Sequence, residues 1–232
     1  QIYNQAAKFK YMFGGKAETP VVIRTMVGAG IRAAAQHSQM LTAIFTHIPG
    51  LKVVCPSNPY DAKGLLIQSI RDNDPVIFCE HKSLYGVEGE VSEESYVIPF
   101  AEANVLRDGG DATIVAYGMM VGKALDAAET LAKEGVECDV IDLRTLSPID
   151  METVLESVEN TGRLVVVDEA NPRCSIATDV SAQVAQQAFK SLKAQIEMVT
   201  APHTPVPFSP TLEDLYIPSA EQIADAVRKT HN

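Results

Sequence analysis

The 232-residue sequence predicts an α/β fold in two units, of which the first is incomplete. Runs of β-branched residues alternate with helical segments, and this alternation is typical of parallel β-α-β units. A polar, acidic segment with two glycines, residues 81–98, interrupts the alternation and predicts a linker between the units. The sequence begins with Gln1 and not with Met, and it runs at once into helix-like residues. We therefore expect the N-terminal part of the first unit to be missing.

The first unit contains two predicted helices and three predicted strands. Residues 3–13 predict a helix that ends at Gly14 and Gly15. A second helix begins with Asn58 as its N-cap and Pro59 as its first residue, because both residue types are favoured at those positions. The strands are predicted at residues 20–26, 51–56 and 75–80.

The second unit repeats the alternation over a longer stretch. A helix over 120–134 has apolar residues on one face and ends at Gly135. Three further helices are predicted near 150–159, 176–190 and 219–230. Strands are predicted at residues 112–118, 137–143, 163–169 and 196–201. The sequence contains no internal repeat and no low-complexity tract.

Charge and composition argue against several classes of function. The formal net charge is −11 and there is no basic run, which argues against nucleic acid or an anionic membrane surface as a partner. No run of 18 apolar residues is present, as a membrane-spanning helix would need. Cys55, Cys79, Cys138 and Cys174 lie far apart, without zinc-type spacing. We expect reduced cysteines in a cytosol-like compartment.

A glycine-rich stretch, VGAGIRA at residues 27–33, follows a predicted strand. It matches the G-x-G-x-x-A pattern of dinucleotide-binding folds, in which the glycines let a pyrophosphate approach a helix N-terminus. Such folds also place an acidic residue about 20 residues further on. Here the next strand ends in Cys55-Pro56-Ser57. We therefore favour a loop that shapes some other cleft over a nicotinamide site.

Two further places carry side chains that suit chemistry. His37 follows the glycine-rich loop at the C-terminal end of a predicted strand, an edge at which open α/β sheets bind ligands. The pattern alone leaves a structural histidine and an acid-base histidine both open. Asp72 and Asp74 close a helix, where they either cap the chain or help to hold a hard cation. His203 lies in a proline-rich segment, which favours a packing or interface role over catalysis.

Long stretches of the chain resemble the β subunit of thiamine-diphosphate-dependent 2-oxoacid dehydrogenases, the decarboxylating components of the pyruvate, branched-chain and acetoin complexes. The resemblance covers the whole sequence in order, and EHKSLYGVEGEV is most similar to the acetoin branch. It implies half of a pyrimidine-binding domain over 1–85, a linker over 86–97 and a transketolase C-terminal-like domain over 98–232. Both domains are expected to be three-layer α/β/α structures. The stretches that carry it are QIYNQAAKFKYMFGG, AAAQHSQ, HIPGLKVVCPSNPYDAKGLL, SIRDNDPVIF and VIDLRTLSPID.

The resemblance also implies which residues have functional roles. His37 matches the family's active-site histidine. A potassium site, formed mostly by backbone carbonyls, falls on Val21, Ser69, Ile70, Asp72 and Asp74. The last of these departs from the family, which often has asparagine there. The glutamate that activates the cofactor and the aromatic residue that stacks on it would lie in the missing N-terminal part. No cofactor-binding residue is therefore assigned, and magnesium and the diphosphate would be held by the α subunit.

The implied function is that of a subunit of a bacterial cytoplasmic oxidoreductase. It would cleave acetoin with thiamine diphosphate and transfer the acetyl unit to lipoamide. The implied partners are an α subunit, in an α2β2 heterotetramer, and a lipoyl acyltransferase core. One alternative is a pyruvate or branched-chain 2-oxoacid dehydrogenase. An alternative of another class is a non-catalytic module that docks on the acyltransferase core.

Overall fold

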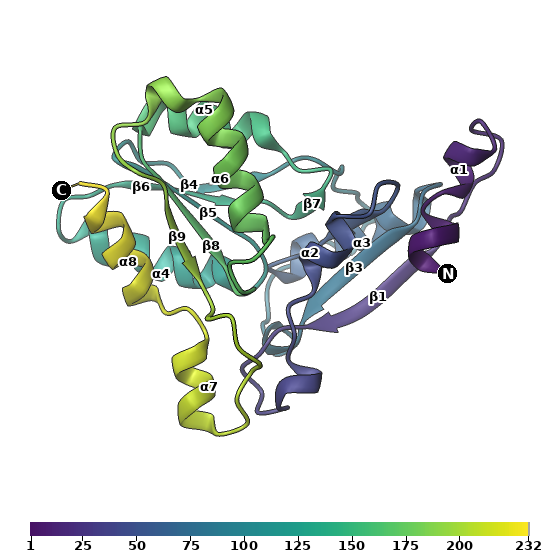
Figure 1. The fold of residues 1–232 in the computed structure, drawn as a ribbon, viewed down its shortest axis with the longest axis horizontal. Helices are drawn as coiled ribbons and strands as arrows, with labels where there is room; N and C mark the ends of the chain where they lie inside the picture. The colour runs from purple at the N-terminus through teal and green to yellow at the C-terminus, as the bar shows by residue number, and fades with distance from the viewer. Residues whose placement is uncertain (232) are drawn as a thin grey trace.

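The computed structural model describes residues 1–231, which form two separate β-sheets (Figure 1). The first sheet has four strands in the order β1-β3-β2-β7 and the second has five in the order β4-β6-β5-β8-β9. The strands of the first sheet are β1 (Val22–Val27), β2 (Lys52–Val54), β3 (Val76–His81) and β7 (Thr145–Ser147). Those of the second are β4 (Asn104–Arg107), β5 (Ala112–Ala116), β6 (Cys138–Asp142), β8 (Leu164–Asp168) and β9 (Glu197–Thr200).

Strands β1, β2 and β3 are parallel, as the alternating pattern predicts. Helix α3 (Pro59–Arg71) connects β2 to β3 and supplies the crossover that parallel strands require. Its predicted start is confirmed, because the Asp61 amide donates to Asn58 Oδ1 at 2.9 Å and Pro59 is the first helical residue. Strand β7 runs antiparallel to β2 and comes from the second half of the sequence.

The second sheet is covered by helices on both faces. Alternate residues of its strands point to opposite faces. Thus Ile114 packs with α4 (Met120–Ala132) and α8 (Ala220–Lys229), whereas Val115 packs with α5 (Met151–Thr161) and α6 (Ile176–Gln187). Strands β5, β6, β8 and β9 are parallel, and only the edge strand β4 is antiparallel. The predicted α/β class is therefore confirmed.

Three sequence-based expectations need correction. The single helix predicted over 3–13 is two short segments, a π-helical turn (Ile2–Ala6) and α1 (Phe9–Met12), and the buried Ala7 between them lies against Gly50. The predicted linker 81–98 starts too early, because His81 belongs to β3 and Lys82–Leu84 form a 3₁₀ turn. Its Tyr96 ring stacks on Tyr60 at 4.4 Å between ring centroids. Its Ile98 is also buried.

The third correction concerns short elements that the sequence pattern did not indicate. They are β4, β7, α2 (Thr42–Thr46), α7 (Pro210–Tyr216), and the 3₁₀ turns at Ala35–His37, Lys82–Leu84 and Phe189–Ser191. Within residues 1–231, no helix combines the length and apolarity needed to cross a bilayer. All four cysteines are free thiols, and only Cys174 is exposed.

Buried polar contacts join the two sheets at the C-terminal end of β6. The Arg144 guanidinium binds both carboxylate oxygens of buried Asp61 at 2.9 Å. Ser57 Oγ donates to Asp142 Oδ2 at 2.5 Å. Burial raises the pKa of Asp142 to about 7, although the hydrogen bonds from Ser57 and the Arg144 amide act in the opposite direction. Asp142 and Arg144 thus connect the end of β6 to Ser57 and to Asp61 of α3 in the first half of the chain.

We expect Arg144→Met to destabilise the protein, because it leaves the buried Asp61 carboxylate without its cation. Removing one partner of a buried ion pair costs about 3–5 kcal/mol of unfolding free energy. The matched control is Arg24→Met, which removes an arginine whose side chain is 60% exposed in its pair with Glu80 and should cost no more than about 1 kcal/mol. Urea unfolding measures both losses. Equal losses in the two variants would contradict the assigned role of Arg144.

Candidate functional site

The candidate site lies where β1 and β3 end side by side. These strands are parallel and their last residues, Val27 and His81, are partners in the register. The loop after β1, residues 28–41, and the turn after β3, residues 82–87, therefore leave the sheet at the same edge. Ligands of open α/β sheets bind at such carboxyl edges.

The glycines of the loop are required by close packing. Gly28 and Gly30 have φ values of +89° and +103°, in the region that favours glycine. A Cβ atom at Gly28 would lie 1.9 Å from His81 Nε2, and one at Gly30 would lie 2.7 Å from Ser83 Oγ. The glycine pattern thus lets the loop pass directly over the end of β3.

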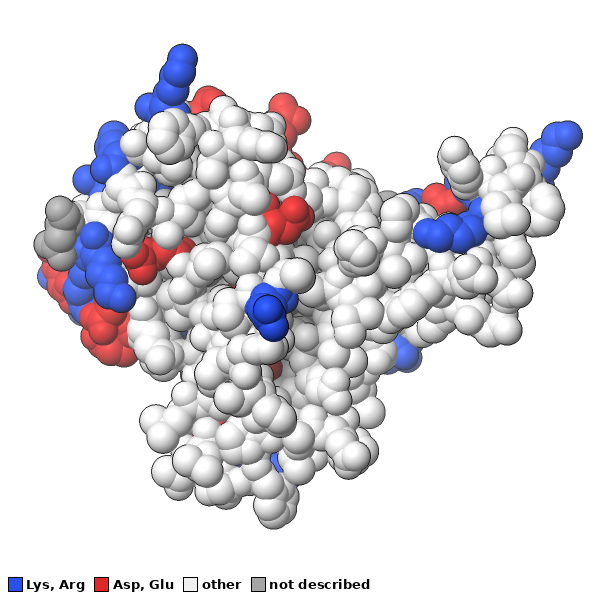
Figure 2. All heavy atoms as spheres, in the orientation of Figure 1, with Lys and Arg blue, Asp and Glu red and all other residues white. Residues whose placement is uncertain are grey.

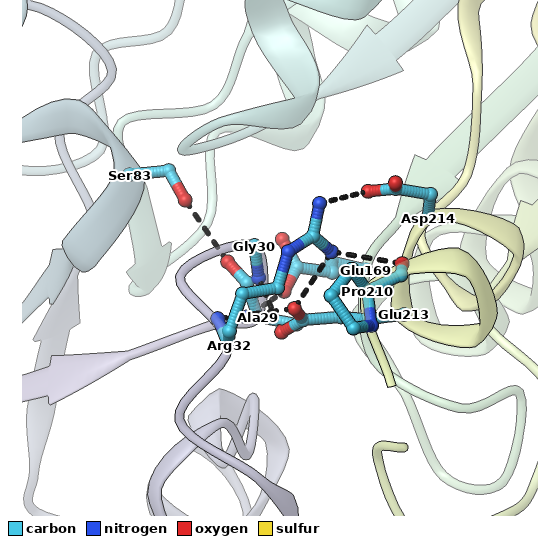
Figure 3. Close-up of polar contacts among 8 residues, drawn as sticks. All are labelled: Ala29, Gly30, Arg32, Ser83, Glu169, Pro210, Glu213 and Asp214. Carbon is cyan, nitrogen blue, oxygen red and sulfur yellow. Dashed lines mark hydrogen bonds and ion pairs between the residues drawn. The ribbon is translucent and has the colours of Figure 1, made fainter. Parts of the chain in front are cut away.

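The amides of this loop bind two glutamates from the second half of the chain (Figure 3). Ala29 N donates to Glu169 Oε1 at 2.6 Å. Gly30 N donates to Glu213 Oε1 at 2.8 Å, and Arg32 N donates to Glu213 Oε2 at 3.1 Å. The two carboxylates occupy the amides that a pyrophosphate would need. The glycine-rich loop is therefore not a dinucleotide site, in agreement with the interpretation that the sequence favoured.

Both glutamates are fully buried, and each has a further donor. Glu213 Oε2 accepts a hydrogen bond from the Arg32 guanidinium at 2.9 Å. Glu169 Oε2 accepts from His81 Nε2 at 2.6 Å. The proton is on Nε2 because His81 Nδ1 accepts from the Ser83 amide at 3.2 Å. Buried charges of this kind are tolerated when every oxygen has a donor.

His37 is exposed and lies in the same loop, beyond the residues whose amides bind the two glutamates. It closes a 3₁₀ turn (Ala35–His37) that begins after Ala34, whose φ is +59°. His37 lines a pocket together with Met26, Ile31, Ala33, Gln36, Gln39, Leu41, Lys82 and Tyr85. His203 is also exposed, and its proline-rich segment lines a neighbouring pocket with Gln36 and Gln39. Of the two histidines, only His37 opens into the pocket at the end of β1 and β3.

The residues of the implied potassium site lie close together, but their side chains have other partners. Ser69 Oγ donates to Leu65 O at 2.6 Å. The Lys52 ammonium binds Asp72 at 2.6 Å and Asp74 at 3.1 Å.

Lys10 also binds Asp74, at 2.6 Å. Burial raises the pKa of Asp74, but the two lysines outweigh it and hold the pKa below its usual value. Across residues 1–231, no three His, Cys, Asp or Glu side chains form a group that could hold a metal. Potassium would therefore be held by main-chain carbonyl oxygens, including those of Val21 and Ile70.

The residues described do not form a complete site for thiamine diphosphate. The loop amides that could bind a diphosphate are taken by Glu169 and Glu213. The pocket at His37 is lined by no carboxylate that could activate an aminopyrimidine ring. The loop and the pocket therefore do not make a self-contained site for this cofactor.

The sequence indicated His37 as a candidate, and it did not indicate Glu169, Glu213 or Lys82. Glu169 follows a strand directly, and an acidic residue after a buried strand was an available signal. Glu213 and Lys82 gave no such signal, because the loop amides that Glu213 binds and the pocket that Lys82 lines form only in the folded chain.

Two family models match the chain. Residues 1–88 match the model described as "Transketolase, pyrimidine binding domain" and residues 101–223 match "Transketolase, C-terminal domain". Among solved structures, the chain is similar to a split-gene transketolase described as an inactive β4 tetramer, with a TM-score of 0.76 and 25% identity. That match covers 92% of this chain and 67% of the other.

The chain is also similar to β subunits of two related enzymes. It is 80% identical to subunit beta of acetoin:2,6-dichlorophenolindophenol oxidoreductase from Cupriavidus necator, over 99% of this chain and 68% of that protein. The corresponding Bacillus subtilis subunit is 57% identical, with 96% and 65% covered. Subunit beta of the pyruvate dehydrogenase E1 component of Rickettsia felis is 46% identical, with 98% and 70% covered. This chain thus spans about two thirds of the length of these relatives.

The two transketolase-type domains and the 80% identity agree with the fold and with the resemblance stated from the sequence. The chain belongs to the family of transketolase-like β subunits found in acetoin and pyruvate dehydrogenase components.

Proposed function

We propose that the chain is part of the β subunit of the thiamine-diphosphate-dependent component of an acetoin dehydrogenase complex. In this role it cleaves acetoin and passes the acetyl unit to lipoamide. The supporting site observation is the exposed His37, which lines a pocket and lies in the same loop as the amides that Glu169 and Glu213 bind. The higher identity to acetoin than to pyruvate relatives favours acetoin as substrate over pyruvate or a branched-chain 2-oxoacid.

The proposed assembly is a heterotetramer of two α and two β subunits in the bacterial cytoplasm. The α subunit would supply the magnesium and diphosphate site that these residues lack.

Figure 2 shows a face with few charged side chains around α7 and the loop after β1. Phe208, Leu212 and Leu215 are among the large apolar side chains exposed there, with Leu215 73% exposed. Apolar exposure of this kind is typical of surfaces that another chain covers. The lipoyl acyltransferase core is the second proposed partner.

His37 is proposed to transfer protons and to position the acyl acceptor. An imidazole titrates near neutral pH and can act as either acid or base. Its exposed position at the sheet edge leaves it free to reach a substrate. If the chain were only a non-catalytic docking module, replacing His37 would change no reaction rate.

We expect His37→Ala to leave folding and assembly intact but to slow acetyl transfer. Turnover of acetoin with free lipoamide should fall roughly 10²- to 10⁴-fold, the usual effect of losing a positioned acid-base group. Turnover with an artificial electron acceptor should fall less, because that route bypasses the lipoyl step. The full-length β subunit, assembled with its α subunit, is assayed with acetoin and with pyruvate. The matched control is His47→Ala, since His47 is exposed at the end of α2.

Each outcome of this assay separates the candidate functions. Wild-type turnover of acetoin well above that of pyruvate supports the acetoin assignment, and the reverse supports the pyruvate branch. An assembled enzyme inactive with both substrates indicates the docking module. Wild-type transfer rates in the His37→Ala enzyme would indicate that His37 has a structural role and not a catalytic one.

We further propose that potassium binds between Val21 and the end of α3, held by main-chain oxygens of Val21, Ser69, Ile70, Asp72 and Asp74. The ion would tie the helix end to the sheet, beside the Lys52–Asp72 pair. The carbonyl of Val21 already accepts from the Val76 amide at 2.9 Å, so the ion would use the second lone pair of that oxygen.

We expect Asp72→Ala to lower the melting temperature in every salt, because Lys52 loses its partner. Because the proposed ligands are main-chain oxygens, Asp72→Ala should keep any extra stabilisation by KCl over NaCl at equal ionic strength, as the exposed Asp126→Ala should. Thermal unfolding in the two salts measures both effects. If wild-type protein melts at the same temperature in KCl and NaCl, there is no potassium site.

A further inference from the structure

Lys82 is a buried lysine that the function described so far does not use. It follows His81 at the end of β3 and begins the 3₁₀ turn Lys82–Leu84. Only 9% of its surface is exposed, which is unusual because lysine is almost never buried without a partner. Its position is fixed by the strand, since the neighbouring His81 side chain is held by Glu169.

The Lys82 ammonium has no partner among residues 1–231, where it forms neither a hydrogen bond nor an ion pair. The nearest candidates are engaged elsewhere. Glu169 is bound by His81 and Ala29, and Glu213 is bound by the loop amides and Arg32. Burial lowers the pKa of Lys82, and the negative charges of these two glutamates only partly oppose that effect. The Lys82 ammonium is not among the fully buried polar atoms that lack a partner, so the stem is buried and the charged end reaches the pocket.

Lys82 lines the same pocket as His37. The two residues come from adjacent parallel strands whose ends meet, so their proximity follows from the topology. No carboxylate lines this pocket, although the chain carries a net charge of −11. Tyr85 directs its hydroxyl away to Glu80 Oε2 at 2.7 Å. The pocket therefore offers a positive charge and an imidazole to a ligand that brings its own oxygen acceptor.

We propose that Lys82 binds an acceptor oxygen of the substrate in the His37 pocket. This inference rests on the proposed function and deepens it. The ligand class is a small 2-oxo compound, and the oxygen is either the ketone oxygen of acetoin or the carboxylate of a 2-oxoacid. Hydrogen bonds from charged donors are short and strong, so a fixed ammonium orients such an oxygen relative to His37.

Competitive labelling tests the contact without turnover. The enzyme assembled from full-length β subunit and α subunit is treated with acetic anhydride, and acetylation of Lys82 is followed by mass spectrometry with and without ligand. Exposed Lys133, at the end of α4, is the internal reference. We expect saturating acetoin or pyruvate to slow labelling of Lys82 severalfold and not that of Lys133. Protection by acetoin identifies the ketone oxygen as the partner, and protection by pyruvate alone identifies the carboxylate.

Kinetics of Lys82→Met provide the second measurement. The KM of the protected substrate should rise roughly 10- to 100-fold, as loss of a charged hydrogen bond predicts. The melting temperature should not fall, because the ammonium bonds to no residue described. Lys82→Arg should restore part of the affinity, and Lys133→Met should behave as wild type. If Lys82→Met does not fold, the labelling result decides alone.

Failure of the inference is distinct from failure of the proposed function. If wild-type enzyme turns over acetoin, but neither ligand protects Lys82 and Lys82→Met keeps the wild-type KM, the inference is wrong and the function stands. If wild-type enzyme does not turn over acetoin but pyruvate protects Lys82, the inference stands and the acetoin assignment is wrong.

Discussion

Two buried carboxylates, Glu169 and Glu213, determine how the loop after β1 is placed. Each belongs to the second half of the chain, and each binds main-chain amides of the loop. A buried carboxylate is stable only when its oxygens are fully bonded, so the loop amides and the carboxylates stabilise one another. The glycines are required because the loop must pass within van der Waals distance of His81 and Ser83. The contact thus joins the two sheets and fixes the start of the segment that carries His37.

The same arrangement explains why a basic pocket exists in an acidic protein. The His81 side chain binds Glu169, and the next residue, Lys82, lines the pocket. The carboxylates lie behind the loop and not in the pocket, where His37 and Lys82 are the ionisable donors. Their charge is used to hold the loop, and the pocket is lined by no carboxylate. A substrate that brings an oxygen acceptor would complete this arrangement.

The sequence predicted the long, periodic elements well and the short ones poorly. Helices such as α3 and α4 have an apolar face and clear end signals, so Asn58 and Gly135 mark a start and an end. Strand β7 has three residues and pairs with β2 from the other half of the chain, which no local pattern encodes. His37 could be proposed as a candidate because its place after a strand is local information. The partners of the loop were not, because Glu169 and Glu213 lie 140 and 183 residues beyond Ala29 and Gly30.

Amide hydrogen exchange over residues 28–37 tests the central role of the buried carboxylates most directly. In Glu213→Gln, in the full-length β subunit, the loop loses the charged acceptor for Gly30, Arg32 and the Arg32 guanidinium. The account predicts at least roughly tenfold faster exchange in this segment, the change expected when a charged hydrogen bond is weakened by more than 1.4 kcal/mol. The exposed Glu129→Gln should leave exchange unchanged. Wild-type exchange rates in Glu213→Gln would contradict the account.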